Sequence, residues 1–139
     1  MRLTATLSAC LILTAAIPAH AADVTGLWRS ATNDNGGYIH VDIGACGSDA
    51  SLICGKIVEA FNEDPAKLDK KRRDEIVGKL IIENMKADGA TEWSDGTIWA
   101  PDDDETYAST MELNGDVLEV SGCVLGGLIC RGQDWTRVK

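Results

Sequence analysis

The residues with the clearest chemical potential lie near the C-terminus, where Arg131, Gln133, Trp135 and Arg137 alternate with other residues. In a β-strand, side chains two residues apart point to the same face, so these four would share one face. Burying an arginine and a glutamine inside a sheet is costly unless they form a polar network or bind a ligand. Arg131 and Gln133 are therefore candidate groups for an anionic ligand, and an internal polar network is the alternative.

A second set with the same period of two consists of Tyr107, Ser109 and Met111, in a strand that we expect beside the last one. We predict that these three side chains line the same site. Binding sites for small molecules are concave and mostly apolar, with a few placed polar groups, and the two sets together fit that description. A small barrel can equally be filled by its own side chains, so a packed interior remains the alternative.

The other polar clusters give little support to catalysis or metal binding. His40 and Asp42 would point the same way in a strand, but no nucleophile is paired with them and an exposed strand face explains both. The run Asp102-Asp103-Asp104-Glu105 lacks the spaced carboxylates of a calcium loop, so we interpret it as an acidic turn. The sequence also lacks a phosphate-binding glycine loop, a nucleophile elbow and a zinc-protease helix. We predict a protein without catalytic activity, metal or other cofactor.

The N-terminal residues predict export. Arg2 supplies a positive charge, residues 3–18 carry none, and Ala19-His20-Ala21 places small residues where a signal peptidase cleaves. We therefore predict a signal peptide over residues 1–21, a single domain over residues 22–139, and a location in the periplasm or outside the cell. A membrane anchor would need about 20 apolar residues, and this stretch is shorter. We expect no integral membrane segment after cleavage.

Lipidation of Cys10 is an alternative for this N-terminus, because Leu7-Ser8-Ala9-Cys10 is similar to a lipoprotein signal. The apolar run of a lipoprotein signal lies before its cysteine, whereas most of the run here, residues 11–17, follows it. We therefore favour cleavage without lipidation.

The charge balance excludes one class of partner. The 139 residues contain 13 Lys and Arg against 22 Asp and Glu, a net charge of -9. Without residues 1–21, which hold Arg2 and no acid, the balance is 12 against 22, or -10. A nucleic-acid-binding protein needs basic residues to neutralise phosphates, so we exclude nucleic acid as a partner. A cationic protein partner remains possible.

Four cysteines remain after residues 1–21, namely Cys46, Cys54, Cys123 and Cys130. An even number in an exported chain predicts two disulfides. We favour the local pairs Cys46–Cys54 and Cys123–Cys130 over the crossed pairings. A zinc site is disfavoured because the spacings, C-x7-C and C-x6-C, are not those of zinc ligands.

Short alternating segments separated by turn residues predict a mainly β domain. The expected strands cover residues 24–30, 38–43, 52–61, 79–85, 90–95, 97–100, 106–113, 117–125 and 128–138. One short helix is expected over residues 66–77, after Asp64 as N-cap and Pro65 at the first position. Its basic run, residues 70–73, is interpreted as a solvated face, and a docking site for an acidic partner is the alternative.

Eight or nine strands joined by short turns favour an antiparallel up-and-down β-barrel over an open sheet, because closing the sheet removes its exposed edges. In a closed barrel of this kind the first and last strands are neighbours. Arg137 of the last strand would then lie over Trp28 of the first, in a structural cation–π contact worth about 0.5–2 kcal/mol.

Several segments are similar to one known family: Gly26-Leu27-Trp28-Arg29, Cys46-Gly47, residues 52–58, Thr106-Tyr107-Ala108, residues 122–131, Gln133 and Trp135-Thr136-Arg137-Val138. Through these segments the chain resembles the DUF2147 family of bacterial exported proteins. The resemblance implies a small lipocalin-like (calycin) barrel in the periplasm or secreted, and it carries no established activity over to the residues of this chain. Where members often carry an Asn-Pro-Asp segment before a shared glycine, this chain has its basic helix before Gly78.

Two functions follow from these observations. The leading prediction is a non-catalytic exported protein that binds a small apolar or anionic ligand in its barrel, through the residues named above. The alternative is an acidic protein-interaction module, such as an inhibitor of a basic lysozyme or protease, because a net charge of -10 would speed encounter with a cationic enzyme.

Overall fold

A computed structural model describes residues 22–139. The expected signal peptide over residues 1–21 and the possible lipidation of Cys10 lie outside these residues. Within the described part of the chain, every helix is too short or too polar to cross a bilayer.

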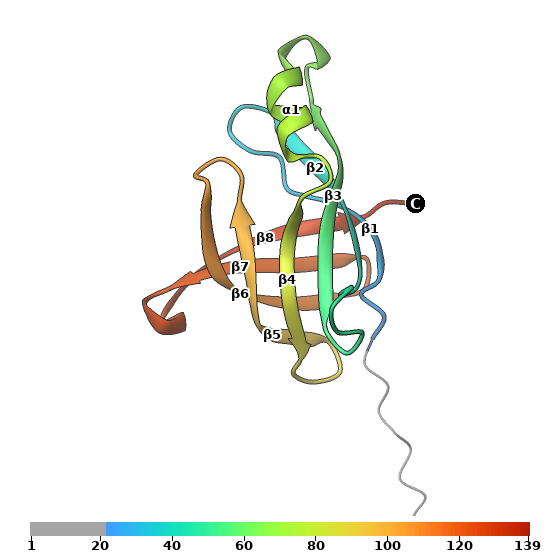
Figure 1. Ribbon diagram of the computed structural model, residues 1–139, viewed down its shortest axis with the longest axis vertical. Coiled ribbons are helices and arrows are strands. Elements are labelled where there is room, and N and C mark those ends of the chain that lie inside the picture. The colour runs from blue at the N-terminus through green and yellow to red at the C-terminus, as the bar shows by residue number, and fades with distance from the viewer. Residues whose placement is uncertain (1–21) are drawn as a thin grey trace, which may run out of the picture.

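Residues 22–139 form a closed barrel of eight antiparallel strands, each paired with the next along the chain (Figure 1). The strands are β1 (Gly26–Arg29), β2 (Gly37–Ala45), β3 (Ile53–Asn62), β4 (Leu80–Ala87), β5 (Glu92–Ala100), β6 (Glu105–Asn114), β7 (Val117–Val124) and β8 (Ile129–Arg137). The prediction of an up-and-down, lipocalin-like β-barrel is confirmed. We call the end of the barrel that carries the β1–β2, β3–β4, β5–β6 and β7–β8 connections the helix end.

One strand is longer than expected. The strands predicted over residues 90–95 and 97–100, on either side of the turn-forming pair Asp95-Gly96, are one strand, β5 (Glu92–Ala100). Asp95 has a φ of 60° and the pairing with β6 shifts between Trp93 and Gly96, so the turn residues form an irregularity within a continuous strand. A Cβ at Gly96 would overlap Met85 and lie 2.6 Å from the carbonyl oxygen of Glu83, so only glycine fits there.

The predicted helix over residues 66–77 is also corrected. Residues Pro65–Lys67 form a 3-10 turn, η1, and the α-helix α1 covers only Lys70–Ile76. The chain is extended at Leu68, with φ −64° and ψ 117°, and Asp69 then accepts a hydrogen bond from Arg72 N. Two aspartate caps, Asp64 and Asp69, thus divide the segment into two short pieces. Gly78, which ends the helical region as expected, has a φ of 91°.

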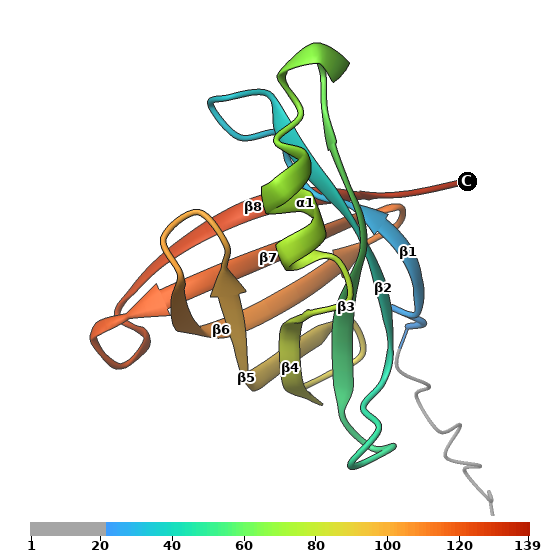
Figure 2. The ribbon, with the colours of Figure 1, turned by 45° about the horizontal axis from the view of Figure 1, so that its top comes forward.

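The helix α1 lies beside β3 at the helix end (Figure 2). Arg73 donates to both carboxylate oxygens of Glu59 in β3, at 2.6 and 2.8 Å, and Ile76 is buried. Arg72 donates to the carbonyl of Pro101, in the β5–β6 connection. The basic helix is therefore fixed at both sides of the barrel's helix end, through its arginines.

The barrel closes through a short seam. β1 has four residues and pairs with β8 at Trp28–Arg137 and Arg29–Thr136, whereas β7 pairs with β8 along its length. Within residues 22–139, the part of β8 from 129 to 134 has no β1 residue opposite it. The barrel is therefore closed at the end where β1 begins and β8 ends, whereas towards the helix end β8 is unpaired on its β1 side, and we call this gap in the pairing the opening.

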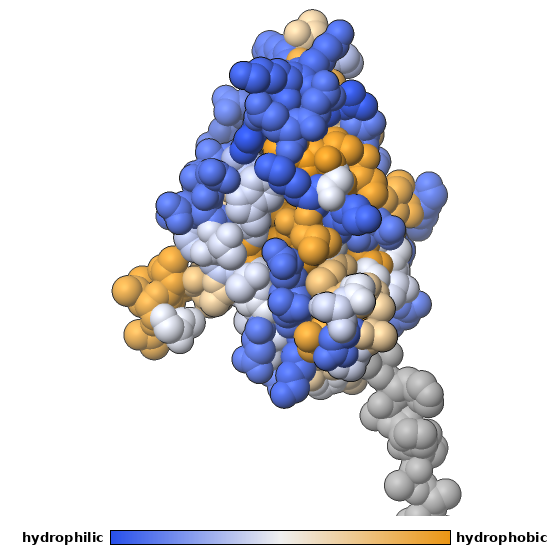
Figure 3. Space-filling model, in the orientation of Figure 1, coloured by the Kyte–Doolittle hydropathy of each residue, from blue (hydrophilic) through white to orange (hydrophobic). Residues whose placement is uncertain are grey.

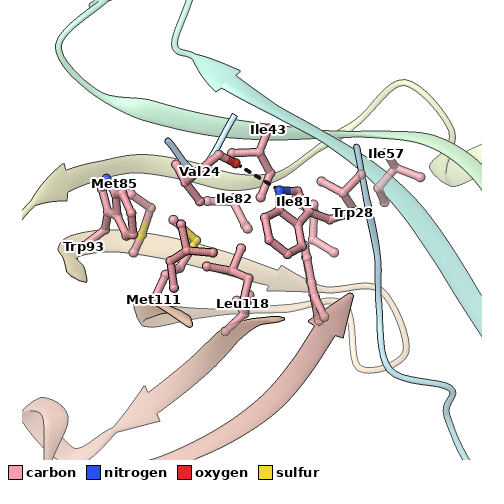
Figure 4. Packing of buried hydrophobic residues seen from close by; sticks show 14 of the residues in the cluster. Val24, Trp28, Ile43, Ile57, Ile81, Ile82, Met85, Trp93, Met111 and Leu118 are labelled. Atoms are coloured by element: carbon pink, nitrogen blue, oxygen red, sulfur yellow. Dashed lines mark hydrogen bonds between the residues drawn. The ribbon is translucent and has the colours of Figure 1, made fainter. Parts of the chain in front are cut away.

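Large side chains fill the closed part of the barrel (Figure 4). Trp28 and Trp135 are 0% and 1% exposed, and they lie with Ile57, Ile82 and Leu118 among the fully buried side chains. Trp28 Nε1 donates to the carbonyl of Val24, so the polar atom of this tryptophan has a partner. A packed interior, which was the alternative to a ligand site in the sequence analysis, is therefore present in this half of the barrel.

Arg137 reinforces the seam through several groups at once. Its guanidinium lies 4.3 Å from the centre of the Trp28 ring, the contact expected from the sequence. The same guanidinium donates to the carbonyls of Thr25 and Asp23, at 2.8 and 3.0 Å. It also lies 3.6 Å from Asp116. One side chain therefore ties the last strand to the segment before β1.

The two local disulfides are present in the described residues. Cys46 and Cys54 are joined across the β2–β3 connection, and Cys123 and Cys130 face one another across β7 and β8. They close loops of 8 and 7 residues. In the chain-entropy model, each loop of this size contributes about 2–3 kcal/mol.

Replacing Arg137 should weaken the seam measurably. Arg137→Leu removes the cation–π contact and the hydrogen bonds of a charged donor, so we expect the free energy of unfolding to fall by about 2–4 kcal/mol. Urea unfolding followed by tryptophan fluorescence measures this change. Lys139→Met, which removes only an exposed ion pair with Asp116, serves as the control and should change it by less than about 0.5 kcal/mol. Equal effects of the two variants would contradict this role of Arg137.

The contact between α1 and β3 should depend on pH. Hydrogen bonds from Arg73 and from Ala60 N lower the pKa of Glu59 from 4.5 to about 2. A lowered folded-state pKa stabilises the fold above the unfolded-state value, and this contribution is lost as the pH falls from about 4.5 towards 2. Glu59→Gln should therefore be less stable than wild type at neutral pH, with the difference shrinking over this range. Thermal melts against pH test this, with the exposed Glu83→Gln as control; a difference that is constant with pH would refute it.

Candidate ligand-binding site

The inner faces of β6, β7 and β8 are arranged in three rows of opposed residues. The row nearest the closed end consists of Leu113, Leu118 and Trp135, and all three are buried. The middle row is Met111, Val120 and Gln133. The row nearest the helix end is Ser109, Gly122 and Arg131. The face is thus apolar at its closed end and becomes polar where the barrel opens.

The sequence-predicted residues occupy this face at different depths. Met111 and Ser109 are each 2% exposed, Tyr107 is half-buried, and Arg131 and Gln133 are exposed. Arg131 and Gln133 are accessible because β1 does not extend opposite them. The structure therefore places the two sets of candidate residues on one continuous face, partly inside the barrel and partly at its opening.

One expectation about this arrangement was wrong. We expected Tyr107, Ser109 and Met111 in a strand adjacent to the last one, but β7 lies between β6 and β8. The intervening residue of the row is Gly122, which has no side chain. A Cβ at Gly122 would lie 3.5 Å from both Ile98 and Tyr107, so these two side chains pack over the glycine. Ser109 and Arg131, with backbones about 10 Å apart across three strands, therefore lie on the same face, the serine buried and the arginine exposed.

Two buried polar atoms on this face lack partners. Ser109 Oγ and Trp135 Nε1 have no hydrogen-bond partner among the described residues. A buried polar group without a partner costs about 1–3 kcal/mol, so such atoms indicate a bound water or ligand that supplies the missing bond. Both can donate: one through a hydroxyl and the other through an indole N–H. They lie in different rows, Trp135 near the closed end and Ser109 near the helix end, and each could donate to a hydrogen-bond acceptor.

The β5–β6 connection forms part of the rim at the helix end. Its acidic residues accept hydrogen bonds: Asp103 from Tyr107 Oη at 3.4 Å, and Asp104 from Trp99 Nε1 at 3.1 Å. Asp102 accepts from Asn33 in the β1–β2 connection at 3.3 Å. Burial and the neighbouring Asp103 raise the pKa of Tyr107, so its phenol stays protonated at neutral pH. This run, interpreted as an acidic turn from the sequence, orders the side chains at the rim.

A second feature lies on the outer face of the barrel, where four carboxylates are opposed in one row. Glu92 faces Glu112, Glu112 faces Glu119, and Glu119 faces Asp134. All four residues are exposed. Like charges directly opposite one another destabilise a sheet. A shallow hollow of about 350 Å³ touches three of them, so this acidic row is accessible from solvent.

The pair His40 and Asp42 lies on the outer face of β2. His40 packs 4.6 Å from the ring of Phe61 and 6.0 Å from that of Tyr38. Burial and the nearby Arg29 lower its pKa, so the imidazole is neutral at pH 7. The histidine is thus part of an aromatic cluster on the outside. In residues 22–139, no group of three or more His, Cys, Asp or Glu side chains is arranged to hold a metal ion.

Sequence reasoning missed two residues of the site. Gly122 separates Ser109 from Arg131 and is covered by Ile98 and Tyr107, and Trp135 contributes an unpartnered N–H although it was assigned only to the shared face. Alternation along β7 could have placed Gly122 on the inner face, because Leu118 and Val120 precede it with the same period. No sequence signal marks the indole N–H as unpartnered.

A closed eight-stranded meander, with an apolar interior and polar groups at its open end, defines a lipocalin-like barrel. A structure search supports this class: protein HP1028 from Helicobacter pylori, described as belonging to the lipocalin family, matches with a TM-score of 0.65 and 12% identity over 84% of each chain. The chain belongs to the DUF2147 family, described as uncharacterized proteins conserved in bacteria, whose sequence profile matches residues 26–137. No curated protein sequence matches it.

Proposed function

We propose that this protein binds a small molecule with a hydrogen-bond-accepting head group and a short apolar part, at the open side of its barrel and without catalysis. The row formed by Ser109, Gly122 and Arg131 is the observation that carries the proposal. An unpartnered buried hydroxyl and an exposed guanidinium lie in one row of the inner face, and the residue between them has no side chain. Such an arrangement can hold one small polar group between two donors.

The hydrogen-bond donors on this inner face favour a ligand with an anionic head group. Arg131 and Gln133 present N–H groups at the opening, and Ser109 and Trp135 supply unpartnered donors inside. Within residues 22–139, no carboxylate lies within salt-bridge distance of Arg131, although the chain as a whole is acidic. A guanidinium binds a carboxylate through two parallel hydrogen bonds. A carboxylate ligand would therefore supply the ion pair that Arg131 lacks.

The apolar part of the ligand would lie against Ile98 and Tyr107, the half-buried side chains that pack over Gly122. The closed half of the barrel is filled by Trp28 and Trp135, so a long chain would not fit deep inside. This favours short acids over long-chain lipids. Export to the periplasm or the outside is part of the proposal. The two disulfides support it, because disulfides persist in an oxidising compartment.

Thermal stability in the presence of octanoate tests this proposal. At ten times its Kd, octanoate should raise the melting temperature by about 5 °C, and octanol, which lacks the charge, should raise it less. Arg131→Ala should abolish the increase with octanoate. Lys56→Ala, which removes an exposed cation from the outer face of β3, should retain it. The proposal fails if no short carboxylic acid stabilises the wild type, or if Arg131→Ala responds as the wild type does.

The acidic row supports a second candidate function, the binding of a cationic protein such as a basic lysozyme. Glu92, Glu112, Glu119 and Asp134 keep an arrangement that costs stability, and a cationic surface would relieve their mutual repulsion. The net charge of the whole chain acts in the same direction, since it speeds encounter with a positively charged partner.

Binding to a basic lysozyme, measured by calorimetry at low and high salt, distinguishes this candidate from the first. If the acidic row is the contact, the double variant Glu112→Gln/Glu119→Gln should weaken binding at least tenfold at low salt, and high salt should have a similar effect on wild type. Arg131→Ala should leave this binding unchanged. Glu63 and Glu83 are exposed acids outside the row. If Glu63→Gln/Glu83→Gln weakens lysozyme binding as much as Glu112→Gln/Glu119→Gln does, the affinity depends only on the net charge.

A further inference from the structure

The connection between β7 and β8 carries an apolar tip, which we define as residues 124–129. Its large side chains are exposed: Val124 by 43%, Leu125 by 68%, Leu128 by 86% and Ile129 by 54%. In Figure 3 this tip projects from the side of the molecule as an isolated hydrophobic surface. Single exposed apolar residues are ordinary, but a contiguous exposed group of them indicates a site that binds a protein, a membrane or a ligand.

The tip is held in this exposed form by its own structure. The disulfide between Cys123 and Cys130 joins the two strands at its base. Between them, Leu125, Gly126 and Gly127 all have positive φ, at 54°, 66° and 90°, and Leu128 N donates to the carbonyl of Leu125 at 3.3 Å. A leucine in the left-handed region is uncommon and unfavourable, which points to a function for the turn. The side chains are therefore fixed outwards.

We propose that the apolar tip inserts into the surface of a lipid bilayer. The six residues between Cys123 and Cys130 carry no charge, so the whole tip can leave water without burying an ionised group. Its backbone is compact and crosslinked, so little conformational freedom is lost on insertion. Apolar side chains on a protruding element of this kind bury themselves at the boundary between head groups and acyl chains.

The size of the tip favours a bilayer over a second copy of the chain. Four exposed apolar side chains form a patch of a few hundred Å², whereas a stable protein interface buries about 800 Å² on each partner. The patch cannot grow along β8, because Arg131, Gln133 and Asp134 behind the tip are polar and exposed. A bilayer requires no matching surface beyond the tip itself.

The charge of the protein specifies the kind of bilayer. The chain has a net charge of -9, and the acidic row that includes Glu119 and Asp134 lies on the outer face behind the tip. Anionic lipids would repel this surface at low salt. The tip should therefore prefer zwitterionic lipids, and its binding should survive high salt because it depends on apolar burial. This proposal does not rest on the ligand site, which involves other side chains.

Flotation with phosphatidylcholine vesicles tests the proposal. Wild type should bind these vesicles and retain binding in ~1 M NaCl, and it should bind an equal mixture of phosphatidylcholine and phosphatidylglycerol less at low salt. Leu128→Asp should lower the partition coefficient about tenfold or more, since it replaces the most exposed apolar side chain by a charge. Leu80→Asp, which changes an exposed leucine in β4 of 42% exposure, is the matched control and should bind as wild type does.

A second variant reports insertion directly. In Leu128→Trp, the added tryptophan should shift its emission to shorter wavelength on vesicle addition and be quenched by brominated acyl chains. Circular dichroism of each variant checks that its fold is retained. The proposal is overturned if wild type does not float with the vesicles, if Leu128→Asp floats equally well, or if the tryptophan shows no shift. A dimer in analytical ultracentrifugation that Leu128→Asp dissociates would instead identify a second copy as the occupant.

Discussion

Closure of the barrel depends on the seam between β1 and β8, because these strands are the farthest apart in the sequence and every other pair is joined by a connection within the barrel. The seam has two residue pairs, so its hydrogen bonds alone are few. Arg137 compensates by contacting the Trp28 ring and the carbonyls of Thr25 and Asp23. The loss of chain freedom on joining the two ends is thus offset by one side chain with several partners.

The shortness of that seam also creates the opening at which ligand binding is proposed. If β1 continued along β8 beyond Arg29, it would cover the inner face where Arg131 and Gln133 lie. The same omission leaves the β7–β8 hairpin without a neighbour on one side, so its tip stands clear of the barrel. Both proposed binding surfaces are therefore consequences of a four-residue first strand.

Much of the fold could be predicted from the sequence because alternation and turn residues are local signals. They placed most strands to within a few residues, and closure of the meander then placed Arg137 on Trp28. The wrong element boundaries involve side chains whose role depends on which of two nearby residues acts as a cap, or on neighbours far away in the chain. Asp69 caps a helix that Asp64 was expected to begin, and Asp95 bends a strand that it was expected to end.

The site was less predictable than the fold for the same reason. The alternation of side chains along a strand places each residue on one face of the sheet. It does not show whether a neighbouring strand covers that residue or whether a buried hydroxyl has a hydrogen-bond partner. Ser109 and Arg131 belong to one row only because Gly122 of β7 stands between them, and strand order was needed to see this.

The two disulfides have a consequence for how the chain matures. Among residues 22–139, the first cysteine is bonded to the second and the third to the fourth. A chain that enters an oxidising compartment from its N-terminus exposes Cys46 and Cys54 together, well before Cys123 arrives. Oxidation in order of emergence therefore gives the native pairs directly. On the proposed export route, maturation would need an oxidant but no reshuffling of mispaired thiols, which is the slower reaction.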